Sequence, residues 1–454
     1  SRSSAASDVY KRQILYSSIR RSFFSSQADR TRSLAALMTG TAGIIQTKMG
    51  LEHESCYHEL CRLLGKLNTA NQLTELSASE AFGAWIDQVY NFTIKSLEEW
   101  NILPNSKHYL LGLWSHMVIP LIYQGDRAPT NLDKYIHSIT VTFIQSRMKL
   151  AEAIAQGSDV DNPLESEVAR TEQLDVLAQL SRCQYQETAE YIVQLFEQVT
   201  DAAKNGTISH DCFISQITWC VYMHGALIGG HSIKLRRPLM PASSVTSSSS
   251  AMSSSSASAS TKVNEQKQQT SYHVLNGKLA RLVFGLSQQT DQLPETPESL
   301  ELAYLYFLEQ FRKVCLGDYA KQFIQPETED ATLASILGVQ SDDDVLSLII
   351  NKIGRNLQTK SKMETVVQKT IALFHELAAG ISIVQYTDRT THLIVSGRLL
   401  LKNERVRQIL RNHASPELAF LNVPSYGRHR TSYYFTLSKL LFLDAKEEEP
   451  NTPN

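Results

Sequence analysis

The stretch HESCYHELC, residues 53–61, places two histidines and two cysteines within nine residues. These are zinc-ligand types, and a tetrahedral zinc site needs its ligands to converge at about 2.0–2.3 Å, usually from two separate clusters. On a helix each residue advances by about 100°, so Cys56 and His58 would point about 160° apart. No second cluster of ligand types follows elsewhere in the sequence. We therefore expect no metal site in this stretch.

The same stretch fits a core helix much better. Its apolar positions recur at helical spacing and fall within about 120° of the helix circumference, which is the pattern of a stripe that faces the core. The stripe consists of Cys56, Tyr57, Leu60, Leu63, Leu64 and Leu67. We interpret the segment as a buried helix.

Other catalytic patterns are absent from the sequence. It contains no GxSxG, no glycine-rich phosphate loop and no HExxH. The acidic segment SDVDNPLE, residues 158–165, lacks the glycine and the spacing of a calcium loop. The histidines are scattered, and a single histidine on an apolar helix is usually a core residue. We expect no enzyme activity, no catalytic residue, no bound metal and no cofactor.

The amino-acid composition excludes some classes of binding partner. Among 454 residues, 44 Lys and Arg nearly balance 46 Asp and Glu, so the formal charge is −2 and nucleic acid is not an expected partner. Six dispersed cysteines are typical of reduced thiols in the cytosol or nucleus. The most apolar run, residues 217–230, is shorter than the roughly 20 residues that a membrane span needs. We interpret it as a buried helix whose Gly225, Gly229 and Gly230 indicate close packing and a helix stop, and expect no membrane insertion.

Helical periodicity extends along most of the chain, and no clean period-two alternation interrupts it. One apolar stripe contains Leu300, Tyr304, Phe307, Phe311 and Val314, and Ser341 precedes three acids as a helix cap would. In the segment 104–120, Ser106 is a candidate cap and Pro120 is expected to end the helix. The pattern predicts an all-α fold, a HEAT-like α-solenoid of stacked antiparallel helix pairs.

The sequence also suggests a division into segments. We expect residues 1–13 to be a non-native leader, because SDVYKRQ looks like a translated adapter, and residues 14–238 to form HEAT-like repeats. Residues 239–272 are Ser-rich and polar, and they predict a disordered insertion. Repeats resume over 273–445, and 446–454 are a polar tail.

Several long strings, in this order and at about this spacing, resemble a known family. They include YHELCRLLGKL, NFTIKSLEEWNILPNSKHYLLGLW, SRCQYQETAEYIVQLFEQ, LELAYLYFLEQFRKVCLGD and RQILRNHASPELAFL. The segment is similar to the exportin-7 family, which includes Ran-binding proteins 16 and 17 and belongs to the importin-β superfamily. The resemblance extends over roughly residues 17–444. It is to the middle of such receptors, so the amino-terminal arch that chiefly grips Ran is expected to be missing.

The resemblance implies a nuclear export receptor that shuttles between nucleus and cytoplasm. It implies binding of Ran-GTP and protein cargo, and weak contacts with FG nucleoporins in the nuclear pore. GTP hydrolysis would then be the chemistry of Ran. The alternative is a HEAT-repeat scaffold or regulatory subunit without Ran dependence, which nucleotide-dependent binding would distinguish.

Two charged clusters are candidate partner-binding sites. Asp342, Asp343 and Asp344 form an acidic cluster that a basic surface could contact, although acids at a helix amino terminus also stabilise the helix dipole. Arg405, Arg407 and Arg411 recur along one predicted helix and could bind acidic cargo, although a solvated face explains them as well.

Overall fold

The computed structural model describes residues 23–99, 104–124, 131–231, 274–293, 295–315, 333–379 and 400–445. These ranges are helical apart from their connecting turns, and no β-strand occurs in them. The chain divides into two compact units, one up to Trp219 and one from Cys220 onward. The boundary falls inside helix α10 (His210–His231), and each unit is described by itself.

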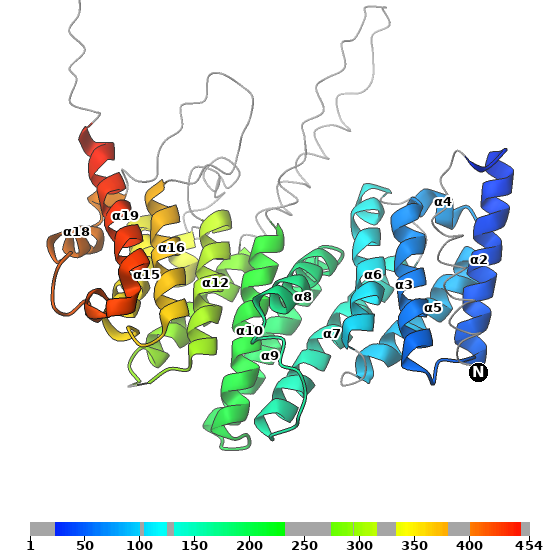
Figure 1. The fold of residues 1–454 in the computed structure, drawn as a ribbon, viewed down its shortest axis with the longest axis horizontal. Helices are drawn as coiled ribbons and strands as arrows, with labels where there is room; N and C mark the ends of the chain where they lie inside the picture. The colour runs from blue at the N-terminus through cyan, green and yellow to red at the C-terminus, as the bar shows by residue number, and fades with distance from the viewer. Residues whose placement is uncertain are drawn as a thin grey trace, which may run out of the picture. The chain divides into compact units, whose positions relative to one another are not determined.

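The first unit is a stack of helix pairs. Its helices before α10 are α2 (Gln27–Thr47), α3 (Glu54–Ala70), α4 (Leu73–Ser77), α5 (Phe82–Glu98), α6 (Pro104–Gln124), α7 (Leu132–Ala155), α8 (Glu167–Leu180) and α9 (Tyr185–Lys204). One row consists of α2, α5, α7 and α9, each in contact with the next, and a second row consists of α3, α6 and α8 (Figure 1). This arrangement is an all-α solenoid, as the sequence predicted.

Side-chain hydrogen bonds join neighbouring pairs at a nearly constant separation along the chain. Trp85 Nε1 on α5 donates to Thr41 Oγ1 on α2 at 2.9 Å, 44 residues away. Other bonds of this kind span 45 to 48 residues and connect Asn68 to Leu113, His58 to Ser106, Tyr90 to Ser138 and Tyr135 to Asp87. Each helix pair is therefore fixed mainly by the pair before it and the pair after it.

The second unit also consists of packed helices, with longer steps along the chain between the helices that contact each other. After the end of α10 come a helix over residues 274–290, α12 (Glu298–Cys315), α14 (Leu333–Leu337), α15 (Asp342–Thr359), α16 (Glu364–Ala379), α18 (Glu404–Arg411), the 3₁₀ turns η5 (Ala419–Asn422) and η6 (Pro424–Tyr426), and α19 (Gly427–Ala445). Helices α12, α16 and α19 form one row, while α15 contacts α14, α16, α18 and η5. His375 on α16 bonds Thr436 Oγ1 on α19 at 3.1 Å, 61 residues away.

Helix α10 is the apolar core helix that the sequence predicted. Residues 217–228 are all buried, and although α10 is long and apolar enough to cross a membrane, 72% of its most apolar window is buried inside the protein. In the second unit it lies very close to α12. A Cβ atom added to Gly225 would lie 3.0 Å from the Cα of Phe307. The absence of a side chain at this position therefore sets the distance between the two helices.

The predicted stripe of α12 is confirmed, whereas the predicted end of α6 is wrong. Every member of the stripe is buried, from Leu300 at 0% exposed to Val314 at 7%. Helix α6 starts at Pro104 and continues through Pro120 to Gln124. A proline removes one backbone hydrogen bond but does not always end a helix. The buried side chains of Met117, Val118 and Leu121 on either side of Pro120 favour continuation of the packed helix.

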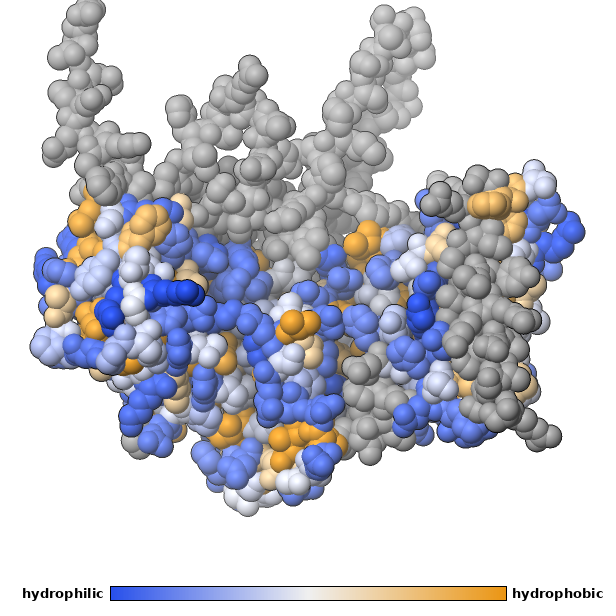
Figure 2. All heavy atoms as spheres, viewed as in Figure 1, coloured by the Kyte–Doolittle hydropathy of each residue, from blue (hydrophilic) through white to orange (hydrophobic). Residues whose placement is uncertain are grey.

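Hydrophilic residues cover most of the visible surface of the described helices, and hydrophobic residues appear there in small separate areas (Figure 2). Helix α19 contributes the exposed side chains of Phe435 and Leu441.

The predicted leader 1–13, the Ser-rich insertion 239–272 and the tail 446–454 lie outside the described residues. The proposed segment boundaries therefore stay predictions.

Candidate functional site

The acidic cluster lies at the first turn of α15, where it caps the helix. The Ser341 side chain accepts a hydrogen bond from the Asp344 backbone N–H at 3.3 Å, and Asp344 Oδ2 accepts one from the Ser341 N–H at 2.9 Å. This reciprocal pair is a capping box, and it places negative charge at the positive end of the helix dipole. Asp342 is the first residue of the helix, and its side chain lies outside the described part. The capping role therefore explains the acidic residue at position 344 without a partner protein.

Asn403 connects this turn to α18. It is fully buried, and its Nδ2 donates to Asp343 Oδ1 at 3.1 Å and to Ser347 Oγ at 2.8 Å. Its Oδ1 accepts from the backbone N–H groups of Arg405 and Val406, so the same amide is also the amino-terminal cap of α18. One side chain thus fixes α18 against α15 and brings the predicted acidic and basic segments together.

The three predicted arginines of α18 do not share one role. Arg407 Nη1 lies 3.5 Å and Arg411 Nη1 2.8 Å from carboxylate oxygens of Glu404, so these two guanidinium groups are paired within the helix. Arg405 Nη1 donates to the neutral Oε1 of Gln408 at 3.2 Å. Within the described residues, no carboxylate lies within salt-bridge distance of Arg405. Arg407 and Arg411 thus share the single carboxylate of Glu404, whereas Arg405 has no such partner among the described residues.

A groove of about 250 Å³ runs between α15, α18 and the segment that leads to η5. Its lining includes the apolar side chains of Ile350, Leu357 and Leu418, which are nearly or fully buried. Arg355 from α15 and Arg405 from α18 also line it, and the lining includes the amide side chains of Asn351, Gln358, Gln408 and Asn412. Glu417 is the only carboxylate among the lining residues of this groove. The groove therefore has a buried apolar floor and a polar lining with a positive charge balance.

A buried charge cluster holds α15 against α12 and the end of the 274–290 helix. Glu301 is 0% exposed, and its oxygens lie 2.8 Å from Lys352 Nζ and 3.3 Å from Lys360 Nζ. Lys352 Nζ also lies 2.6 Å from Asp291 Oδ1 and 4.9 Å from the centre of the Tyr304 ring. Two ammonium groups and two carboxylates neutralise one another, which a buried charge requires.

Tyr304 belongs to the same cluster. Burial, and to a smaller extent the charges of Glu301 and Asp291, raises the pKa of its phenol well above the ordinary value. The neutral hydroxyl lies 3.1 Å from Thr290 Oγ1, and either oxygen can donate. The tyrosine acts here as a hydrogen-bonding core residue and not as an acid or base near neutral pH.

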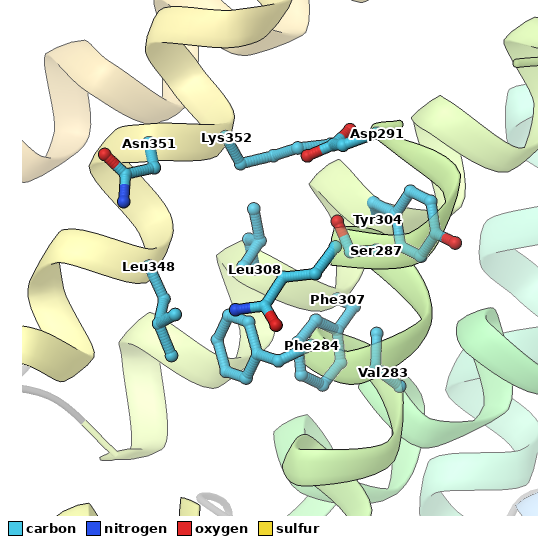
Figure 3. Close-up of a pocket in the computed structure, with 11 residues that line it drawn as sticks. Val283, Phe284, Ser287, Asp291, Tyr304, Phe307, Leu308, Leu348, Asn351 and Lys352 are labelled. Atoms are coloured by element: carbon cyan, nitrogen blue, oxygen red, sulfur yellow. The ribbon is translucent and has the colours of Figure 1, made fainter. Parts of the chain in front are cut away.

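Beside this cluster lies a small pocket of about 80 Å³ (Figure 3). The rings of Phe284 and Phe307 line it together with Leu308 and Leu348, and the Lys352 side chain extends along it toward Asp291. The two rings meet edge to face, with their centres 5.5 Å apart. The pocket is apolar on one side and charged on the other, so a single aromatic or aliphatic side chain with a polar neighbour suits it.

The stretch of histidines and cysteines at residues 53–61 forms the start of α3, with His53 just before the helix. Cys56, Leu60, Leu63, Leu64 and Leu67 of the predicted stripe are buried, and Tyr57 is half-buried against Phe92. The side chain of His58 lies 3.0 Å from Ser106 Oγ, which serves as this partner and not as the predicted cap. Burial raises the pKa of the Cys61 thiol above its ordinary value. In the described ranges, no three histidine, cysteine or acidic side chains gather in a way that could hold a metal.

Sequence comparison relates the chain to proteins of known type. A family model described as "Exportin-7-like, TPR domain" matches residues 150–238 and 256–429, more than half of the chain. TPR repeats, like HEAT repeats, are stacked helix pairs, in agreement with the solenoid described above.

Individual relatives match almost the whole chain. Ran-binding protein 17 from Homo sapiens is 31% identical over 455 residues, which cover 97% of this chain and 37% of that protein. Exportin-7-B from Xenopus laevis is 32% identical over 446 residues, covering 95% and 36%. Exportin-7 from Dictyostelium discoideum is 27% identical over 441 residues, covering 94% and 39%. The chain thus spans a little over a third of the length of these relatives, and none of their names denotes an enzyme.

Proposed function

Because the chain belongs to the exportin-7 family, we propose that it forms the central segment of a nuclear export receptor. The receptor binds Ran-GTP together with protein cargo and shuttles between nucleus and cytoplasm. The observation that carries this proposal is the match of the family model over more than half of the chain. The names of the relatives, exportin and Ran-binding protein, supply the expected partners.

The physical properties of the fold support such a role. Neighbouring helix pairs are joined by a few hydrogen bonds each, so small changes in many interfaces can add up to a change of curvature. Binding of one partner can in this way alter the affinity for another without any catalytic group in the receptor. GTP hydrolysis is assigned to Ran, and no catalytic role is proposed for this chain.

Passage through the pore needs weak contacts with FG nucleoporins, and the pocket beside Lys352 is our candidate for one of them. Its lining by Phe284, Phe307 and Leu348 offers edge and face contacts to a phenylalanine side chain. The small volume limits occupancy to about one side chain, which is consistent with a weak and rapidly reversible contact.

The receptor role is tested on the complete receptor that contains this segment, by measuring its affinity for Ran loaded with GTP and, separately, with GDP. We expect a clear preference for Ran-GTP. Equal or absent binding to the two forms would contradict the proposal and favour a helical scaffold that acts without Ran.

The pocket is tested separately with immobilised FG-repeat peptide. Leu348→Asp places a charge in the pocket and should weaken the retention of the protein on the peptide. Leu346→Asp is the matched control, because Leu346 is also half-buried on α15 but does not line the pocket. Equal retention of the two variants would show that the pocket does not bind the FG-repeat peptide.

A further inference from the structure

We infer that the groove between α15 and α18 binds an extended acidic peptide segment of a partner protein. The inference deepens the proposed function, on which it rests, because such a segment would belong to an exported cargo. Its starting observation is a pair of arginines, Arg355 and Arg405, that line one groove from two different helices.

The charge balance of the groove favours an anionic occupant. Arg405 is exposed, and among the described residues its guanidinium group bonds only the neutral amide of Gln408, through Nη1, so its other donors are available. Arg355 Nε lies 3.5 Å from Asp291, and its side chain is 40% exposed. Against these two cations the lining offers one carboxylate, Glu417. Guanidinium groups bind carboxylates through paired hydrogen bonds, which adds direction to the attraction.

The amides of the groove suit the backbone of a peptide. Asn351 and Gln358 line it from α15, and Asn412 lines it from the end of α18. All three are exposed, and within the described part of the chain none of their side chains makes a hydrogen bond. A primary amide offers both donors and an acceptor, so it can pair with the N–H and C=O groups of an extended chain. The apolar side chains beneath them are almost fully buried, so the contacts open to a peptide are mainly these polar groups.

The same lining disfavours a nucleic acid. Among the lining residues there is no aromatic side chain on which a base could stack. We therefore assign the groove to an acidic polypeptide.

Asn403 is the positioning residue for this groove. Its Oδ1 bonds the backbone N–H of Arg405, while its Nδ2 bonds two groups on α15. The first turn of α18, and with it the start of the Arg405 side chain, is thereby held at a fixed place relative to α15. The arginine is presented by a rigid turn, so less entropy is lost on binding than with a mobile one.

The test uses the complete 454-residue chain and a fluorescein-labelled peptide of about twelve residues, in which glutamate alternates with serine. A second peptide carries glutamine in place of every glutamate. Fluorescence anisotropy gives the affinity for each peptide, at low salt and again at raised salt. We expect the glutamate peptide to bind, the glutamine peptide to bind about tenfold more weakly or worse, and salt to weaken the binding.

Two variants make the assignment specific. Arg405→Gln should weaken binding of the glutamate peptide by about tenfold or more. Arg407→Gln is the matched control, because Arg407 belongs to the same helix but pairs with Glu404 and does not line the groove. We expect that control to change the affinity less than about twofold. Both residues are exposed, so neither change should affect folding, and circular dichroism checks this.

Three results would overturn the inference: unchanged affinity of Arg405→Gln, an equal loss in Arg407→Gln, or equal binding of the two peptides. Binding of Ran-GTP is measured separately, on the complete receptor that contains this segment. If that receptor prefers Ran-GTP but the 454-residue chain does not bind the glutamate peptide, the groove inference fails and the receptor role stands. If binding of the glutamate peptide depends on Arg405 while the complete receptor does not bind Ran-GTP, the groove stands and the receptor role fails.

Discussion

The buried charge cluster around Glu301 gives the sharpest test of the packing in the second unit. The perturbation is Lys352→Met, which keeps most of the length of the side chain and removes its ammonium group. Lys352 is 4% exposed and lies within 2.8 Å of two carboxylates, so its charge is fully engaged in the folded state. Its loss leaves Glu301 buried with a single cation, Lys360, at 3.3 Å.

The expected cost follows from these contacts. Removal of one partner from a buried ion pair typically lowers the free energy of unfolding by about 3–5 kcal/mol, because a charge is left without compensation. Here Glu301 keeps Lys360, and Asp291 is 19% exposed and can be hydrated. The loss should therefore lie near the lower end, at about 3 kcal/mol.

Urea unfolding monitored by circular dichroism measures this loss. All four tryptophans precede residue 220, so tryptophan fluorescence follows the first unit, and its transition should move less than the dichroism signal. The double variant Glu301→Gln/Lys352→Met removes the buried carboxylate as well. It should be destabilised by clearly less than the sum of the two single changes. A loss below about 1 kcal/mol, or strict additivity of the two changes, would refute the reasoning.

Four other substitutions test the packing of α10, the Asn403 cap and the buried His224. Gly225→Ala should lower stability by about 1–3 kcal/mol, because its Cβ would press on the Cα of Phe307. Gly229→Ala should change stability by less than about 1 kcal/mol, because the flexible end of Gln310 can move away; equal thermal midpoints for the two variants would contradict this. Asn403→Ala should cost about 2 kcal/mol and speed amide hydrogen exchange in α18, since it removes a helix cap and buried hydrogen bonds to α15; unchanged exchange would exclude the positioning role. Burial lowers the pKa of His224 from 6.5 to about 4, so the unfolded chain takes up its proton first as the pH falls. Stability should therefore drop between about pH 6.5 and 4, by up to about 3 kcal/mol, and His224→Gln should remove most of that drop in urea midpoints measured across this range.

Local patterns in the sequence were sufficient for the fold class and for most helix faces. The stripe from Leu300 to Val314 is buried as predicted, because helical periodicity alone decides which side of α12 faces the core. The cap at Ser341 was also predictable, since a cap depends on residues within one turn. The end of α6 was not, because packing around Pro120 decides it and that packing involves distant segments.

The candidate site could not be predicted from local patterns, because its contacts join residues that are far apart in the sequence. In the sequence, Glu301 looks like an ordinary surface acid. Its burial is stabilised by the ammonium groups of Lys352 and Lys360, which lie more than fifty residues later in the chain. The three arginines of α18 were grouped by spacing, yet Arg405 and Arg407 are separated by about 200° on a helix and so face different surroundings. Asn403 could have been recognised as a cap before an acid, but its bonds to α15 could not.

The nearly constant separation of the hydrogen bonds between helix pairs also bears on how this chain can change in evolution. A substitution at Thr41 would change the hydrogen bond with Trp85, 44 residues later, and one at His375 would change the hydrogen bond with Thr436, 61 residues later. Compensating changes are therefore expected about one step away along the chain, near 44 to 48 residues in the first unit and 60 to 65 in the second. Distant repeats are free to diverge independently, so one part of the solenoid can acquire a new partner while the others keep theirs.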